Sequence, residues 1–210
     1  MRVTSVRTSS VVRVRGMRTG YGKQAAAGPV RLGKEGFDGD AQADRRYHGG
    51  ADMAALAYAV AHYPRWREEL SWPELGPGAF GENLPVEGAD EHSVCIGDVW
   101  RVGSAVLQVA SPRKPCSKIS RFWQKPELLK LVVQSGRTGF YFRVLEEGVI
   151  EAGDEVVIAD RPHPEWPVLR VFRIGMARAK DRATARATAQ TVTALAERWK
   201  AWLRFEPADI

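Results

Sequence analysis

The sequence has little cysteine, little histidine and no long apolar segment. Its 210 residues include two cysteines and four histidines. Two cysteines cannot form a disulfide framework, so we expect a protein of the reducing cytoplasm. No run of about 18 apolar residues occurs, which predicts that no segment spans a membrane. Residues 1–18 contain five Arg and no apolar core, so we do not expect them to be a secretory signal.

Acidic residues are missing at one end of the chain and scarce at the other. Residues 1–18 contain no Asp or Glu, and residues 161–210 carry a net charge of +5, whereas residues 19–160 carry −4. A pI near 9.5 would suit a nucleic-acid-binding protein. The basic excess lies at the ends, however, and no basic strand face interleaved with aromatic residues accompanies it. We therefore do not expect nucleic acid to be the partner.

Residues 1–160 read mainly as short strands joined by glycine-rich turns, which is typical of a β-barrel or sandwich. Residues 99–102 and 105–109 form the clearest hairpin, with Gly103-Ser104 as a type II′ turn. Residues 139–145 and 155–159 are expected to form a second strand pair. Helices are expected over 59–70 and over 118–133, where Pro126 should divide the segment into two short helices.

A second region begins after residue 160, and we expect domains at 1–160 and 161–210. Residues 161–167 contain three prolines and form an irregular linker. Apolar residues then recur at helical spacing, which predicts three short helices. Three short helices bury little surface alone, so this extension should dock on the main domain or on a second subunit in a homodimer. Trp199 and Trp202 are expected to pack between its helices.

Several segments match, in whole or in part, motifs of known binding sites, but their sequence context excludes those sites. Residues 76–81 fit G-x-G-x-x-G, but no strand precedes them and no helix follows, which excludes a dinucleotide fingerprint. Residues 38–49 lack the glycine and the glutamate of a calcium loop. The histidines and cysteines are too scattered for a zinc site.

The two cysteines differ in their surroundings. Cys95 lies between Val94 and Ile96 and is expected to be a buried structural thiol. Cys116 lies in a proline-fixed loop with four basic residues within five positions, just before a predicted helix. Nearby cations favour the thiolate, which is both a nucleophile and a soft metal ligand. An inert loop cysteine is the alternative that the spacing leaves open.

Three glycine-flanked polar segments could bind an anion. They are residues 40–50, 78–83 and 135–139, and the last contains Arg137. Glycine lets backbone N–H groups approach a ligand, and arginine matches phosphate oxygens in pairs. Each segment could equally be an ordinary surface turn.

Taken together, the chain resembles the family of MOSC domains, named for the C-terminal domain of molybdenum cofactor sulfurases, and in particular its small bacterial YiiM-like branch. The resemblance covers residues 1–160 and rests on these segments: Gly39-Asp40-Ala41-Gln42-Ala43-Asp44, Tyr47-His48-Gly49-Gly50, Ala57-Tyr58, His62-Tyr63-Pro64, Gly78-Ala79-Phe80-Gly81-Glu82-Asn83-Leu84, Ile96-Gly97-Asp98, Pro112-Arg113-Lys114-Pro115-Cys116, Ser135-Gly136-Arg137-Thr138-Gly139 and Arg143-Val144-Leu145-Glu146-Glu147-Gly148. The tail resembles the three-helix extension typical of that branch.

The resemblance implies a mainly β fold, with a β-barrel-like core, peripheral helices and a small C-terminal three-helix extension. It implies a molybdenum cofactor whose metal is held by Cys116, and pyridoxal phosphate binding is a further property associated with it. It also implies an oxidoreductase that reduces N-hydroxylated compounds such as 6-hydroxylaminopurine with electrons from a separate flavoprotein. The alternative is a carrier of the cofactor, or a sulfur-transfer module acting through Cys116, that reduces nothing itself.

The remaining site residues are hypotheses built on this resemblance. Besides Cys116, His48 is a candidate catalytic residue and proton donor to the leaving water. The cofactor, and its phosphate in particular, is expected to be held by basic side chains, and the pocket shaped by neighbouring polar groups. The basic candidates are Arg113, Lys118 and Arg137, and the others are Asp44, Gly49 and Asn83.

Overall fold

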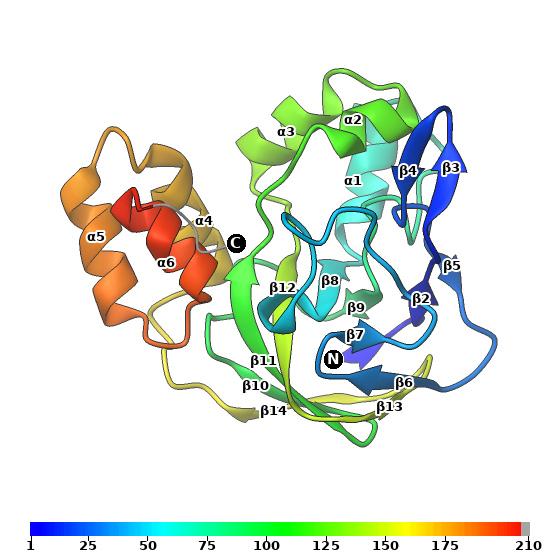
Figure 1. The fold of residues 1–210 in the computed structure, drawn as a ribbon, viewed down its shortest axis with the longest axis horizontal. Helices are drawn as coiled ribbons and strands as arrows, with labels where there is room; N and C mark the ends of the chain where they lie inside the picture. The colour runs from blue at the N-terminus through cyan, green and yellow to red at the C-terminus, as the bar shows by residue number, and fades with distance from the viewer. Residues whose placement is uncertain (207–210) are drawn as a thin grey trace.

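A computed structural model describes residues 1–206, and its centre is a seven-stranded sheet curled into a barrel (Figure 1). All neighbouring strands are antiparallel except β8 and β9. In sheet order the strands are β1 (Arg2–Val3), β9 (Leu84–Glu87), β8 (Ala55–Ala59), β12 (Phe140–Glu146), β11 (Ala105–Pro112), β10 (Val99–Val102) and β14 (Val156–Asp160).

The two edges of this sheet meet and nearly close the barrel. Arg2 and Glu155 form an isolated antiparallel bridge. The Val3 amide donates to the Asp154 carbonyl at 3.0 Å, and the Val156 amide donates to the Met1 carbonyl at 2.9 Å. Closure satisfies edge groups that would otherwise be unpaired. The expectation of a mainly β, barrel-like core with peripheral helices is confirmed.

Short strands outside the barrel form three small sheets. They are β13–β6–β7, β2–β5 and the hairpin β3–β4. Their bounds are β2 Arg7–Thr8, β3 Val12–Val14, β4 Met17–Thr19, β5 Gln24–Ala25, β6 Val30–Gly33, β7 Gly36–Phe37 and β13 Gly148–Ile150.

The predicted hairpin is confirmed, and the second predicted strand pair is wrong. β10 and β11 pair through Gly103-Ser104, with φ of +56° at Gly103 as a type II′ turn requires. β12 and β14 both exist, but β12 pairs with β11 and β8, and β14 pairs with β10. The intervening strand β13 turns away to pair with β6, so chain neighbours do not become sheet neighbours.

Three helices, α1 (His62–Glu69), α2 (Lys118–Trp123) and α3 (Leu128–Ser135), cover one end of the barrel. They close over a second apolar cluster that includes Trp66, Phe80 and Leu128. The predicted division of 118–133 near Pro126 is confirmed. The first helix was predicted to begin at Ala59, which is wrong: Ala59 is the last residue of the buried strand β8, and α1 begins at His62. A 3-10 turn, η1 (Ala51–Met53), precedes that strand.

The three predicted C-terminal helices are α4 (Val168–Ala177), α5 (Arg182–Thr191) and α6 (Glu197–Arg204). Figure 1 shows them as a cluster beside β11. Their buried faces belong to the same apolar core as the barrel, so the extension docks on the main domain. Trp199 and Trp202 pack between helices as predicted, and both contact the position of Gly175 in α4.

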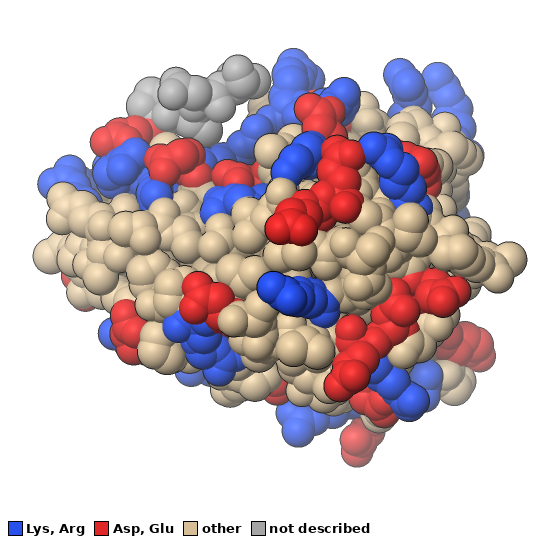
Figure 2. Space-filling view, turned by 90° about the horizontal axis from the view of Figure 1, so that it is seen from below, with Lys and Arg blue, Asp and Glu red and all other residues tan. Residues whose placement is uncertain are grey.

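The structure also bears on the predictions about membrane spans and charge. None of the helices within residues 1–206 combines the length and hydropathy of a membrane span. On the face that Figure 2 shows, Lys and Arg side chains are interspersed with Asp and Glu.

Candidate functional site

Two adjoining hollows lie beside the loop that carries Cys116. The first, called here the barrel pocket, has a volume of about 90 Å³ and is lined by residues of the loops around 19–23, 40–49, 81–83 and 113–118. The second, called the extension cavity, measures about 920 Å³ and lies between the 44–53 segment, the 114–121 segment and helix α6. Cys116 and His48 line both, so the two spaces meet at the sulfur.

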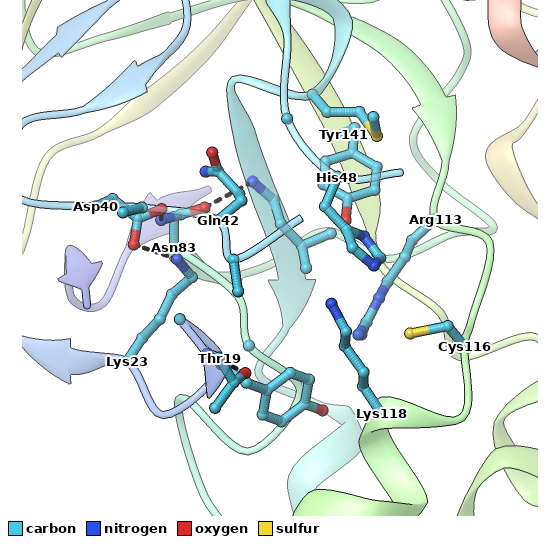
Figure 3. A pocket seen from close by; sticks show the side chains of 18 of the residues that line it. Thr19, Lys23, Asp40, Gln42, His48, Asn83, Arg113, Cys116, Lys118 and Tyr141 are labelled. Atoms are coloured by element: carbon cyan, nitrogen blue, oxygen red, sulfur yellow. Dashed lines mark hydrogen bonds and ion pairs between the residues drawn. The ribbon is translucent and has the colours of Figure 1, made fainter. Parts of the chain in front are cut away.

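Cys116 is a free, half-buried thiol two residues before α2. In Figure 3 its sulfur points toward the side chains of Arg113 and Lys118. Cys95, by contrast, is buried, and its thiol lies 3.4 Å from the carbonyl oxygen of Pro164. Burial raises the pKa of the Cys95 thiol. The structure therefore separates one packed thiol from one thiol that opens into a hollow.

Arg113 brings an uncompensated positive charge to the barrel pocket. It directly follows β11, is only 6% exposed, and its amide donates to the Gly139 carbonyl at 3.0 Å. Its Nη1 is buried and has no hydrogen-bond partner within residues 1–206. Burial alone would lower the pKa of Arg113, but Tyr21, Tyr141 and Cys116 around it raise the pKa instead. A buried guanidinium with a free donor is suited to an anionic ligand.

His48 lies in the same electropositive space. Burial, followed by the charges of Lys118 and Arg113, lowers the pKa of His48 to about 4. Its imidazole is therefore neutral at pH 7 and acts as a hydrogen-bonding group. Figure 3 shows the Tyr141 side chain pointing to the same part of the pocket as His48.

A turn positions His48. The His48 amide donates to the Asp44 carbonyl at 3.0 Å, and Gly49 follows with φ of +98°. This positive φ favours glycine; the atom nearest to a Cβ built there, Oε1 of Gln42 at 2.9 Å, belongs to the end of a flexible side chain that can move aside. The Asp44 carboxylate itself accepts hydrogen bonds from Arg46, which lower its pKa. Gly49 lines both hollows, and Asp44 lines the extension cavity.

Asn83 belongs to a network at the wall of the barrel pocket (Figure 3). Its Nδ2 donates to Asp40 Oδ2 and to the Arg7 carbonyl, both at 3.0 Å, and its Oδ1 accepts from the Leu56 amide at 3.1 Å. Asp40 also forms an ion pair with Lys23, and both side chains are buried. The hydrogen bonds of Asn83 are used within the protein, so it holds the wall of the pocket in place.

Arg137 lies away from both hollows. Its guanidinium carbon stacks 3.6 Å from the ring centre of Trp66, and its Nη2 donates to Glu69 Oε2 at 2.5 Å. The structure thus brings together Cys116, His48, Arg113, Lys118, Asn83, Asp44 and Gly49, but not Arg137.

Helix α6 contributes residues that the sequence did not assign to the site. Arg198, Trp199 and Trp202 line the extension cavity, as does Tyr47 on the opposite segment. Tyr141 lines both hollows. No local pattern in the sequence indicates that the helix over 197–204 packs near the Cys116 loop, so these residues could not be predicted. The one further basic residue that a motif indicated, Arg137 in 135–139, lies outside the site.

Within residues 1–206 no group of three or more His, Cys, Asp and Glu side chains could hold a metal ion. A metal at Cys116 would therefore need further ligands from a bound cofactor.

The barrel, the helical cover and the cysteine loop together define the class of protein. Residues 44–157 match the model of the MOSC domain, and the chain belongs to the MOSC family. MOSC domains are associated with binding of the molybdenum cofactor.

Individual relatives agree with this assignment. The uncharacterized protein YflK of Bacillus subtilis is 44% identical over 185 residues, which cover 88% of this chain and 83% of YflK. A protein of Gibberella moniliformis named reductase is 41% identical over 159 residues, 74% of this chain but only 28% of that protein. The crystal structure of YiiM from Geobacillus stearothermophilus superposes with a TM-score of 0.83 at 33% identity, covering 97% of each chain.

Proposed function

We propose that the protein is a molybdenum-cofactor-dependent reductase of N-hydroxylated compounds, such as 6-hydroxylaminopurine, that receives electrons from a separate flavoprotein. The overall reaction takes up two electrons and two protons, breaks the N–O bond, and releases an amine and water. Support comes from the MOSC family and from a relative named reductase. The observation that carries the proposal is the half-buried thiol of Cys116, which lines both hollows, together with the buried Arg113 Nη1, which has no hydrogen-bond partner within residues 1–206.

The residues of the barrel pocket fit the cofactor. Cys116 offers a soft sulfur ligand for molybdenum. Arg113 offers a buried donor without a partner, and Lys118 adds a second cation, so both suit the cofactor's phosphate. When bound, the cofactor supplies the two-electron redox chemistry. The protein's contribution is to hold it where the barrel pocket opens into the extension cavity.

His48 and Tyr141 are the groups best placed to handle protons. At neutral pH His48 is uncharged, so it orients a ligand by hydrogen bonding. An anion bound beside it would raise its pKa, so that a larger fraction of His48 would carry the proton to be donated to the leaving water. Burial raises the pKa of Tyr141, so its hydroxyl remains protonated and able to donate a hydrogen bond.

Molybdenum analysis tests the proposal. Wild type, Cys116→Ala and Cys95→Ala proteins are purified from cells that make the cofactor, and their molybdenum content is measured. We expect Cys116→Ala to lose the metal and Cys95→Ala to keep it, because Cys95 lies in the core away from both hollows. Equal molybdenum in wild type and Cys116→Ala would refute the ligand assignment.

Activity separates the reductase from the alternative. Wild-type protein is supplied with a flavoprotein reductase and 6-hydroxylaminopurine, and adenine formation is followed. Bound molybdenum without adenine formation would favour a cofactor carrier or a sulfur-transfer module.

A further inference from the structure

The extension cavity exists because the C-terminal helices dock on the barrel. Its floor comes from the segments around Tyr47 and Lys114, and helix α6 provides the facing wall with Arg198, Trp199 and Trp202. The cavity meets the barrel pocket at Cys116. A molecule entering the extension cavity therefore reaches the sulfur from the side opposite the Asp40–Asn83 network.

The residues that line the extension cavity carry more positive than negative charge. Every carboxylate lining the cavity already has an arginine partner, in the pairs Asp44–Arg46, Asp52–Arg143 and Glu206–Arg204. Four cations lining it have no ion pair within residues 1–206, namely Lys114, Lys118, Arg121 and Arg198. A large cavity with unneutralised cations attracts an anion.

Arg198 is the cation best prepared for that anion. Its Nη1 is buried and has no hydrogen-bond partner within the described residues. A buried guanidinium N–H that lacks an acceptor is costly unless a ligand supplies one. Arg113 has the same property in the barrel pocket, so each of the two hollows that Cys116 lines contains one buried guanidinium N–H without a partner within residues 1–206.

The cavity wall is also partly aromatic. Tyr47 is 67% exposed; the Arg46 guanidinium carbon lies 5.8 Å from its ring centre, and the exposed remainder of the ring is accessible to a planar group. Trp202 is engaged already, with Lys114 Nζ 4.6 Å and the Arg178 guanidinium carbon 4.4 Å from its ring centre. The Lys114–Trp202 contact holds this cation of the floor against helix α6, the helix that carries Arg198.

We propose that Arg198 and Lys114 form an anion subsite for the substrate, so that the substrate is a planar N-hydroxylated compound that carries a phosphate or carboxylate group. This inference rests on the proposed function, in which Arg113 and Lys118 hold the cofactor's phosphate. Arg198 is a positioning residue: it holds the anionic end of the substrate while the N–O bond lies near Cys116.

Binding of unreactive analogues tests the subsite without requiring turnover. Protein from cofactor-competent cells, with its molybdenum content measured, is titrated calorimetrically with adenosine 5′-monophosphate against adenosine and with benzoate against benzamide. We expect at least one anionic member to bind about tenfold tighter than its neutral partner. The pair that shows the larger difference identifies phosphate or carboxylate as the group bound.

Arg198→Met should lower affinity for the favoured anion about tenfold and leave the neutral partner unchanged within about twofold. Arg198→Lys should recover part of the loss, because lysine restores the charge without the planar fork. Arg186→Met is the matched control, since Arg186 is an exposed arginine of the same extension outside the cavity. Its affinities should equal those of wild type.

Two results would overturn the inference. One is equal affinity of wild type for the anionic and neutral members of both pairs. The other is loss of molybdenum and pterin from Arg198→Met, which would assign Arg198 to the cofactor's phosphate. Because no analogue is reduced, the titrations stay interpretable even if the protein proves to be a carrier.

Discussion

The low pKa of His48 predicts that anion binding to this site strengthens as the pH falls. Burial and the charges of Lys118, Arg113 and Arg198 lower the pKa of His48 to about 4, while Asp44 opposes them. An anion among these cations offsets their charges and so raises the pKa of His48, but burial, the largest cause of the low value, remains, so the ordinary value of 6.5 is an upper limit. Protonation of His48 and anion binding then favour each other, because the bound anion stabilises the imidazolium and the imidazolium attracts the anion.

The size of the effect follows from these two pKa values. Return from about 4 to 6.5 would make the binding constant about 20-fold larger at pH 5 than at pH 7. His48 is only half-buried, so solvent screening reduces this figure, and we expect roughly a five- to 20-fold increase. The same low pKa means that the folded protein loses stability as pH falls from 6.5 toward 4, because the unfolded chain binds the proton more readily.

Sulfate is the appropriate probe, since its charge does not change between pH 5 and pH 7. Cofactor-free protein is titrated with sodium sulfate by calorimetry at constant ionic strength at both pH values. His48→Gln, which keeps a hydrogen-bonding side chain but does not titrate, is the control. The reasoning fails if the increase in sulfate affinity is the same in wild type and His48→Gln.

Two further predictions concern stability. Glu82→Ala should lower the free energy of unfolding by about 3 kcal/mol in urea, because the buried carboxylate accepts hydrogen bonds from the Gly78 and Phe80 amides and from the Tyr63 hydroxyl; exposed Glu68→Ala should change it little. Gly175→Ala should lower it by about 1–3 kcal/mol, because the new Cβ would lie 2.6 Å from both Trp199 and Trp202. Gly28→Ala, where no atom lies within 4 Å, is its control. If Glu82→Ala or Gly175→Ala proved as stable as its control variant, the surrounding side chains would have to rearrange, and the reasoning from the observed contacts would fail.

The local pattern of the sequence predicted the Cys116 loop, and the family resemblance added residues of distant segments, such as His48 and Asn83, that line the same hollows. Neither predicted Arg198. Arg113, Cys116 and Lys118 lie within six positions of one another in a loop stiffened by proline, so their proximity follows from chain connectivity. Arg198 lines the same cavity as Cys116 only because α6 docks there, and no local pattern encodes that docking.

Two predictions about the fold were wrong, each for a physical reason. All five residues of β8 are buried, so the strand lacks the polar alternation that would distinguish it from the start of a helix. The pairing of β12 with β14 was inferred from their nearness in the chain. The sheet order depends instead on closure of the barrel, which places β11 and β10 between them.

Arg137 shows why a motif can place a residue beside the site without placing it in the site. The glycine-flanked turn has the composition of an anion-binding loop, but Trp66 and Glu69 on α1 occupy its guanidinium. Arg137 Nη1 is also buried without a hydrogen-bond partner within residues 1–206, but the charge of Arg137 is already paired with Glu69 and the side chain lines neither hollow. Arg113 and Arg198 have the same kind of donor, each lines a hollow, and they lie on different elements, one after β11 and one in α6. Since neither belongs to the other's hollow, substitutions at Arg113 should change cofactor content and substitutions at Arg198 should change ligand affinity. On the proposed function, the basic residues that matter are therefore these two and their neighbours in the hollows, and the total charge of the chain plays no part in the argument.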